Sequence, residues 1–450
     1  MKLLVWNDSN AQKVSVKLRI HSGSAFDPQT KEGVMALLGD ILFPNESLKE
    51  YFTEDLGGSL EVTSNYDYIQ INATGNNEQV LTILETLAGA VTKPIIDKDT
   101  TAKVKTVKLE KVKELEKTSS YIAERIIAKQ LFGNFPYGRP QIGTIESLTK
   151  IDFADILLAK QKFLTADNAT LAVSGNVKYD LIYRAARRYF GGWEKADKKI
   201  PATFTQPDEL VAMKLFVEMP NSDNAEIRQA VRGLAKNDKD SMANLVVSKI
   251  LQKRFQKAAA EVSDAKIFVR NDSHLVSGMI IFGGAVSADK AKMLFEKSRK
   301  GDYFQPISQD DLTQGKSAVL SDLNSQIALN QSLANLWLDI DTFKLVSLSQ
   351  QLKTLNSVNL SDTERVLDRL YRDKKFADVL VGDAVKCATA ARRLTGAGWH
   401  VTVVTHEECG CNAGRGCRLW VGTEVVCAAG GEYLEAVVLR RIDTGRIDAC

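Results

Sequence analysis

Cysteine is absent from the first 386 residues of this 450-residue chain, so that part cannot contain a disulfide framework or a cysteine-ligated zinc module. Histidine is also scarce. The four histidines are His21, His274, His400 and His406, and no two of them stand four residues apart. This absence excludes a metallopeptidase helix that presents two histidines on one face with i, i+4 spacing.

A strong excess of charge is missing as well. The net charge of +3 is too small to indicate a nucleic-acid partner, and no phosphate-binding glycine loop is present. The longest apolar run, residues 275–286, contains Ser277 and is too short to span a bilayer. We expect it to form a buried pair of strands. A hydrophobic content of 44% with 26% charged residues is typical of a globular protein.

Three strings in the first half indicate local structure. Residues 14–20 alternate as a strand does. Residues 33–43, GVMALLGDILF, predict a buried helix, which taken alone has no functional implication. Residues 131–144, LFGNFPYGRPQIGT, contain two prolines and three glycines and predict a rigid loop.

Together with GSAFDP at 23–28 and NATLAVSGNV at 168–177, these strings resemble the pitrilysin/insulinase family of zinc metallopeptidases. The helix of that family reads roughly G-L-A-H-L-L-E-H-M-L-F. Its inverted H-x-x-E-H motif falls here on Ala36, Gly39 and Asp40. Alanine and glycine offer no donor atom, and one carboxylate does not hold zinc. The resemblance therefore implies a degenerate, non-catalytic member that binds no metal and no other cofactor.

In that family, the third zinc ligand is a glutamate on a long helix. The corresponding helix is expected at about residues 100–117, with the ligand position near Lys111. Glu110, Glu114 and Glu116 are neighbours and leave the register open. The alternative is a solvated charged face with i, i+4 pairs.

An internal repeat indicates two duplicated domains. Residues 172–177 recur as 380–385, and residues 151–153 are echoed by 360–362, at an offset of about 207 residues. We expect an α+β fold of two α/β domains, each with a mostly antiparallel sheet packed by helices, as in the pitrilysin-like half-clam. The predicted domains are 1–205 and 206–384, and their join lies near residues 198–217.

The tail, residues 385–450, differs from the rest of the chain. It holds all six cysteines, and after Lys386 every basic residue is arginine. Three explanations stay open: a metal-binding appendix, a disulfide-bonded extension, or a foreign end produced by a frameshift or an assembly error. The abrupt change in composition favours the third. We expect this tail to be poorly ordered or separately packed.

The resemblance also suggests substrate-binding residues. An edge strand at about residues 60–71 is expected to take an extended peptide by strand addition, through Val62, Thr63, Ser64 and Asn65. The alternative is an ordinary edge strand. Arg254 is the candidate for the family's substrate-binding arginine, and the alternative is a cation on the surface of a helix. The family's tyrosine seven residues later is replaced by Glu261.

The expected function is that of a non-catalytic subunit of a pitrilysin-like zinc peptidase. Such a subunit supplies half of a peptide-enclosing chamber with a catalytically active partner chain, as in processing-peptidase and bc1-core proteins. The alternatives are a free-standing peptide-binding or structural protein and, remotely, a diverged active metallopeptidase. The first residues of this sequence do not read as a signal peptide, whereas the resemblance leads us to expect a periplasmic or envelope location and leaves open a start further upstream.

Overall fold

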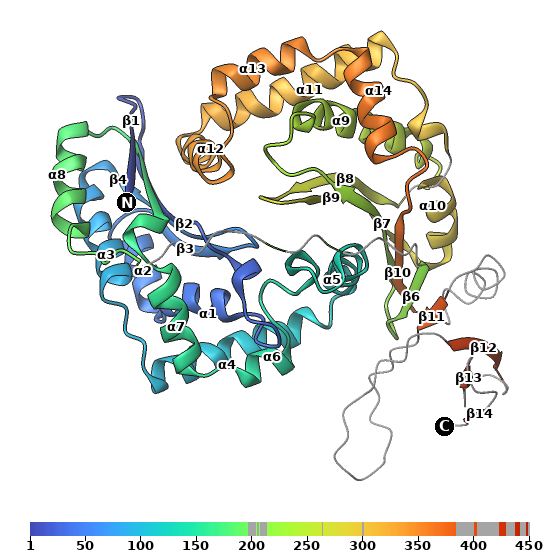
Figure 1. Ribbon diagram of the computed structural model, residues 1–450, viewed down its shortest axis with the longest axis horizontal. Helices are drawn as coiled ribbons and strands as arrows, with labels where there is room; N and C mark the ends of the chain where they lie inside the picture. Colours follow the sequence, from blue (N-terminus) through green and yellow to red (C-terminus); the bar gives the residue numbers. More distant parts are fainter. Residues whose placement is uncertain are drawn as a thin grey trace.

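The computed structural model describes residues 1–196, 204, 207, 214–262, 264–298 and 301–383, together with four short strands beyond residue 399. Figure 1 shows two sheet-and-helix bodies that face each other. Within the described residues, no helix combines the length and apolar character needed to cross a bilayer.

The first domain is built on a five-stranded sheet with the order β1-β5-β2-β4-β3. Only the β1–β5 pair is parallel. The strands are β1 (Lys2–Asn7), β2 (Lys13–Ile20), β3 (Ser59–Ser64), β4 (Ile69–Asn76) and β5 (Ala169–Gly175). The helices are α1 (Val34–Ile41), α2 (Glu46–Glu54), α3 (Val80–Thr92), α4 (Lys98–Leu115), α5 (Ser119–Phe132), α6 (Ile145–Lys150), α7 (Phe153–Phe163) and α8 (Tyr179–Phe190). Short 3₁₀ turns are η1 (Ser24–Phe26), η2 (Asn77–Gln79), η3 (Pro136–Gly138) and η4 (Ala166–Asn168).

The second domain is built on a sheet with the order β11-β6-β10-β7-β9-β8. Its strands are β6 (Lys214–Glu218), β7 (Asn224–Gly233), β8 (Lys266–Ser273), β9 (Gly278–Ser287), β10 (Ala377–Gly382) and β11 (His400–Thr402). Its helices are α9 (Ser241–Ala258), α10 (Ala291–Ser298), α11 (Gln309–Ala328), α12 (Asn330–Phe343), α13 (Leu348–Ser357) and α14 (Leu360–Leu370), with 3₁₀ turns η5 (Ala288–Lys290) and η6 (Gly301–Phe304). A separate small sheet contains β12 (Thr423–Ala428), β13 (Val437–Arg441) and β14 (Ile447–Asp448).

The two domains repeat one topology, which confirms the predicted fold class. The order β1-β5-β2-β4-β3 has its counterpart in β6-β10-β7-β9-β8, and β6–β10 is parallel like β1–β5. The last helix before each parallel strand opens with a capping box. Asp152 and Asp155 form the box of α7, and Asn359 and Asp362 form that of α14.

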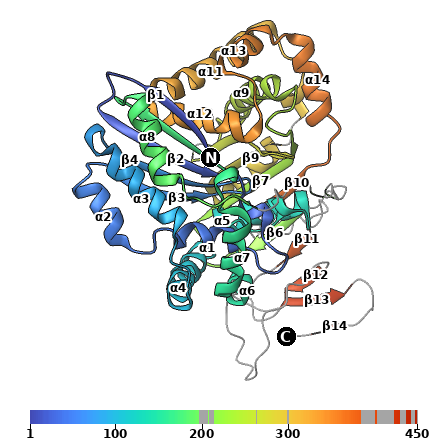
Figure 2. The ribbon, with the colours of Figure 1, turned by 60° about the vertical axis from the view of Figure 1, so that its left-hand side comes forward.

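Each domain lends one helix to the sheet of the other. Helix α5 packs on β7 and β10 of the second sheet, and α12 packs on β5 and β2 of the first. Figures 1 and 2 show both crossings. The α5 crossing is apolar, since Ile127 and Leu131 belong to one buried cluster with Val379 and Val381. The α12 crossing combines a small apolar centre and the aromatic pairs Trp6–Trp337 and Tyr68–Phe343 with several polar contacts.

The expected single strand at residues 60–71 was wrong, because the chain reverses at Asn65. The Asn65 side chain accepts hydrogen bonds from the backbone N–H groups of Asp67 and Tyr68, at 2.8 and 2.9 Å. The segment is therefore a hairpin of β3 and β4. The apolar run 275–286 was also read incorrectly as a strand pair. Only β9 comes from it, and its partner β8 precedes the run.

Some predictions fall on residues outside the described part of the chain. The predicted boundaries after residues 205 and 384 are among them, as is most of the join near 198–217. In the tail, the structure describes only the backbone of β11 to β14. The open explanations for the six cysteines therefore stay predictions.

Candidate functional site

Helix α1 carries the degenerate motif, and its N-terminus is fixed by Asp27. The Asp27 carboxyl accepts hydrogen bonds from the backbone N–H groups of Gly33 and Met35, at 2.7 and 2.8 Å. Burial raises the pKa of Asp27 to about 7, against the effect of these two bonds. Gly33 has φ +104°, a conformation that favours glycine. The helix predicted at 33–43 is thus confirmed as α1.

Neighbouring side chains fill the space at Gly39, the motif position at which the family has its general base. A Cβ atom at Gly39 would lie 3.2 Å from Cγ1 of Val62 and 3.3 Å from Cγ2 of Ile69. Ala36 is 1% exposed. The Gly39 position therefore has no room for a longer side chain unless β3 or β4 moves.

The third motif position, Asp40, forms an ion pair with a buried lysine. Asp40 Oδ2 lies 2.6 Å from Nζ of Lys108 on α4, and the Lys108 side chain is only 7% exposed. The residue of α4 that meets the motif is Lys108, three positions before Lys111, near which the ligand position was expected with the register left open. The face of α4 turned inward contains Thr101, Val104 and Lys108, whereas Lys111 is exposed.

These residues do not fit a zinc ion. Two motif positions lack donor atoms, and the only carboxylate is bound by an ammonium group. Glu110 and Glu114 form surface ion pairs with Lys113 and Lys117. Within the described part of the chain, no three His, Cys, Asp or Glu side chains converge in a way that would hold a metal.

Strand β3 lies at the edge of the first sheet and pairs only with β4 among the described strands. Val62 faces α1 and belongs to the rim of the first core. Thr63 accepts a hydrogen bond from the Asn72 amide at 3.3 Å. Ser64 ends the strand, and Asn65 forms the turn. Peptide binding by these four residues stays a prediction.

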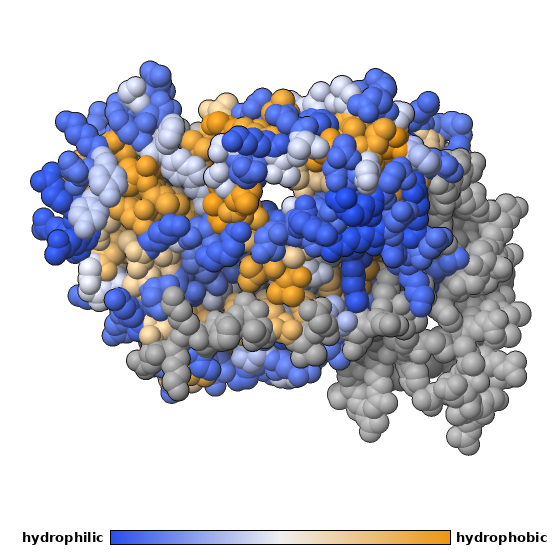
Figure 3. Space-filling view, turned by 45° about the horizontal axis from the view of Figure 1, so that its top comes forward, coloured by the Kyte–Doolittle hydropathy of each residue, from blue (hydrophilic) through white to orange (hydrophobic). Residues whose placement is uncertain are grey.

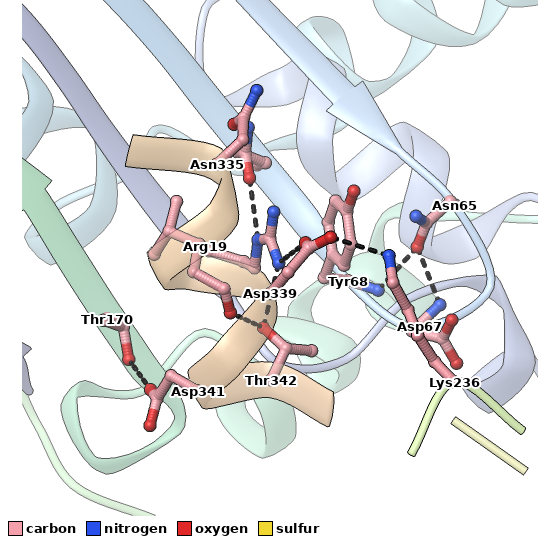
Figure 4. Close-up of polar contacts among 12 residues, drawn as sticks. Arg19, Asn65, Asp67, Tyr68, Thr170, Lys236, Asn335, Asp339, Asp341 and Thr342 are labelled. Atoms are coloured by element: carbon pink, nitrogen blue, oxygen red, sulfur yellow. Dashed lines mark hydrogen bonds and ion pairs between the residues drawn. The ribbon is translucent and has the colours of Figure 1, made fainter. Parts of the chain in front are cut away.

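Figure 4 shows how α12 is held on the polar inner face of the first sheet. Arg19 is 1% exposed and donates to Asp339 Oδ1 at 2.7 Å and to Gln70 at 2.7 Å. Its guanidinium lies 3.8 Å from the centre of the Tyr68 ring. Asp339 also binds Lys236 of the second domain, at 2.6 Å.

Asp341 and His21 extend this contact towards β5. Asp341 accepts from the Thr170 hydroxyl at 2.6 Å and from Lys2 at 2.8 Å. His21 lies between Thr170 at 2.9 Å and Thr342 at 3.2 Å. Burial lowers the pKa of His21 to about 4, because desolvation outweighs the attraction of Asp341.

A second contact joins the tips of two hairpins, one from each domain. Asp67, in the β3–β4 turn, accepts from the Tyr137 hydroxyl at 3.0 Å and from the backbone N–H of Leu275 at 3.2 Å. His274 Nδ1 lies 2.9 Å from the other Asp67 oxygen. The Tyr137 hydroxyl also accepts from the N–H of Val276 at 3.2 Å. The rigid loop predicted at 131–144 thus helps to hold the domains together.

A cavity of about 860 Å³ lies between the two domains. Figure 3 shows the molecule hollowed between them. The walls of this cavity include parts of α5, the loop after η3, the loop before α9, β8 and the loop after α12. The wall includes Tyr66 and His274 but not Val62, Thr63, Ser64 or Asn65.

Arg254 lies outside the cavity wall and is engaged within its own domain. It donates to the carbonyl oxygens of Tyr303 and Gln305, both at 2.8 Å, and to Asp311 at 2.9 Å. The structure does not bring it together with the β3 residues through any hydrogen bond. Its predicted contact with a peptide stays a prediction.

Sequence reasoning missed Lys108 and the interdomain residues Arg19, Asp67, Asp339 and His274. A signal for Arg19 was present, since Lys17 and Arg19 alternate with apolar residues in a strand that is buried on both faces. The pairing with Asp339, 320 residues away, had no local signal.

Models of two domains of one peptidase family match the chain. Residues 2–145 match the insulinase model (peptidase family M16), and residues 150–318 match the model of the peptidase M16 inactive domain. The two matches together cover more than half of the chain.

Curated relatives include both peptidases and a non-peptidase. The uncharacterized zinc protease YmxG of Bacillus subtilis is 21% identical over 397 residues, which are 83% of this chain and 94% of the relative. The non-peptidase homolog YmxG of Helicobacter pylori is 24% identical over 37% of this chain and 39% of its own length. The mitochondrial-processing peptidase subunit beta of Saccharomyces cerevisiae is 22% identical over 43% of each chain.

Solved structures share the fold across most of their length. A peptidase M16 inactive domain from Pseudomonas fluorescens has a TM-score of 0.75 at 18% identity and covers 85% of this chain and 95% of its own. A chain of complex III2 from Candida albicans has a TM-score of 0.70 at 16% identity, covering 84% of this chain and 93% of its own. The family models and these structures agree, and the chain belongs to the insulinase family of peptidases, peptidase family M16.

Proposed function

We propose that this protein is a non-catalytic subunit of an M16 peptidase. The observation that carries the proposal is the state of the motif on α1. Gly39 is packed against Val62 and Ile69, and Asp40 is bound to Lys108. A hydrolytic zinc site needs about three protein ligands and a bound water, and the motif positions of this helix supply one carboxylate, which Lys108 already binds.

The partner in this proposal is a chain of the same family with an intact H-x-x-E-H motif. The two chains together enclose a chamber for an extended peptide, and the open edge of β3 contributes to its wall. Support comes from relatives whose names describe subunits of larger assemblies, the processing-peptidase subunit and the complex III2 chain. The Helicobacter relative is itself named a non-peptidase homolog. A periplasmic or envelope location belongs to the same proposal.

The test is to co-express the full chain with an intact M16 chain from the same genome. Complex formation is followed by size-exclusion chromatography with light scattering. Zinc content and peptidase activity are measured for each chain alone and for the mixture. A stoichiometric complex with zinc only in the partner, and activity raised by mixing, supports the proposal. A monomer with no effect on the partner would leave a free-standing binding protein as the better account. Zinc and activity in this chain alone would favour the diverged active peptidase.

A further inference from the structure

The wall of the cavity between the domains keeps an excess of positive charge once its ion pairs are assigned. All three carboxylates of its wall are engaged. Asp238 binds Arg369 at 2.7 Å, and Asp272 binds Arg270 at 2.7 Å. Glu124 binds Arg270 at 2.6 Å and Arg228, from behind the wall, at 2.8 Å. No carboxylate of this wall is left to attract a cationic ligand.

Two cations of the wall have no carboxylate partner among the described residues. Arg139 donates one hydrogen bond, from Nη1 to the backbone carbonyl of Asp27 at 3.0 Å. Its Nε–H is buried and has no hydrogen-bond acceptor. The Arg139 charge acts on the buried Asp27 carboxyl without a direct ion pair. Lys239 is exposed, and within the described part of the chain it forms no ion pair.

A buried guanidinium N–H without an acceptor is unfavourable unless something supplies one. The other cations of the wall are satisfied by the protein. Lys236 binds Asp339 at 2.6 Å, and Arg125 binds Glu116 at 2.6 Å. Arg139 and Lys239 are therefore the two cations of this wall that an added anion could meet without displacing a carboxylate.

Apolar side chains lie in the same wall. Leu245 is 39% exposed and Val346 is 53% exposed, and both line the cavity with Met242 and Met279. A site that combines exposed apolar side chains with unpaired cations suits a ligand with both characters. Inorganic anions use only the cations, whereas a peptide segment with an acidic group beside an aliphatic residue uses both.

We propose that this cavity binds a peptide segment through a carboxylate. Arg139 and Lys239 bind the carboxylate, and Leu245 and Val346 contact the aliphatic neighbour of the acidic residue. This inference rests on the proposed function only in taking the ligand to be a peptide, and it names the substrate class as a peptide that presents a carboxylate, from a side chain or from its C-terminus. It requires no partner chain, because both walls belong to this chain.

The test is fluorescence anisotropy with the full chain and fluorescein-labelled octapeptides rich in leucine. One peptide contains two aspartates and an amidated C-terminus, and a second replaces both aspartates with asparagine. A third has no acidic side chain but keeps a free C-terminal carboxylate, and a fourth contains two lysines. We expect one of the two carboxylate peptides to bind at least about tenfold more tightly than the asparagine peptide. The tighter of the two identifies the source of the carboxylate.

Variants locate the binding in the cavity. We expect Lys239→Gln and Arg139→Gln each to weaken binding of the preferred peptide by about three- to tenfold. Arg139→Lys keeps the charge but loses the planar donors, and it should also weaken binding. The matched control is Lys93→Gln, an exposed lysine at the end of α3 and outside the cavity wall, which should have no effect. Lys239 is exposed, so its variant should fold normally.

Equal binding of all four peptides, or equal effects of Lys239→Gln and Lys93→Gln, would overturn the inference. Tightest binding of the lysine peptide would overturn it too. Its failure is separate from that of the proposed function, since complex formation with an active chain is measured independently. A chain that binds the acidic peptide but forms no complex keeps this inference and loses the subunit role.

Discussion

Lys108 Nζ lies 2.6 Å from Asp40 Oδ2, and this ion pair joins α4 to α1 at the place where the active members of the family carry their metal. One partner is a motif residue, and the other lies on the helix expected to supply the third ligand. This ion pair thus connects α1 and α4 in the way that a shared metal ion would connect them. The link is structural and leaves no open coordination position.

Removing the carboxylate of Asp40 should destabilise the protein. Asp40→Asn leaves the buried ammonium of Lys108 without its counter-charge, so we expect the free energy of unfolding to fall by about 1–3 kcal/mol, measured by urea denaturation. Glu110→Gln removes an exposed ion pair of the same helix and is the matched control, with an expected loss below about 0.5 kcal/mol. Adding Lys108→Met to Asp40→Asn should recover most of the loss. Equal losses in the two single variants would contradict this account.

Restoring the motif alone should not restore a zinc site. In the triple variant Ala36→His, Gly39→Glu, Asp40→His, the new side chain at position 39 meets Val62 and Ile69, and Lys108 still faces the site. We expect a loss of about 1–3 kcal/mol of stability from overpacking. We also expect less than one zinc per chain by plasma mass spectrometry. Adding Lys108→Glu supplies a third ligand and should raise the zinc content. Full zinc occupancy in the triple variant would show that Lys108 does not oppose the metal.

Asp339 should be the main anchor of α12. Asp339→Asn removes the counter-charge of the buried Arg19 and of Lys236, and we expect a loss of about 2–4 kcal/mol. Hydrogen exchange should increase in α12 before it increases elsewhere in the second domain. Asp322→Asn, which removes a surface ion pair with Lys249, is the control. Unchanged exchange in α12 would argue against the anchor.

His21 should make the stability fall on mild acidification. Its folded pKa of about 4 lies below the ordinary value of 6.5, so the unfolded chain takes up the proton first. The His21 contribution is fully present above pH 6.5 and is lost as the pH falls towards about 4. Asp27 acts in the opposite sense over the whole of this range, because its folded pKa is raised from 3.8 to about 7. The measurement is therefore the difference between the wild-type protein and His21→Asn, from urea denaturation at pH 7, 6, 5 and 4. A constant difference would refute the assignment.

The fold could be predicted from the sequence because local sequence patterns mark its main strands and helices. The repeat at 172–177 and 380–385 marks the two parallel-paired strands β5 and β10, and the capped helices before them are α7 and α14. The hairpin turn at Asn65 was overlooked because a side-chain turn interrupts a run that reads as one strand.

The candidate site could be predicted from the sequence only at positions where the residue lacks a donor atom for a metal. Ala36 and Gly39 lack donor atoms whatever the structure. The register of α4 was not predictable from the count of residues alone, and Lys108 rather than Lys111 faces α1. The contacts of Arg19 with Asp339 and of Asp67 with His274 join distant segments, and nothing local in the sequence specifies such pairs.

The exchange of α5 and α12 has a consequence for how the chain reaches its native state. Neither domain buries both faces of its sheet with its own helices, so half of the chain made alone would leave an apolar surface of β7 and β10 or of α5 in water. The two halves should therefore melt in one cooperative transition. At high concentration during refolding, α5 of one copy can seat on the second sheet of another, and domain-swapped dimers are the expected misassembly.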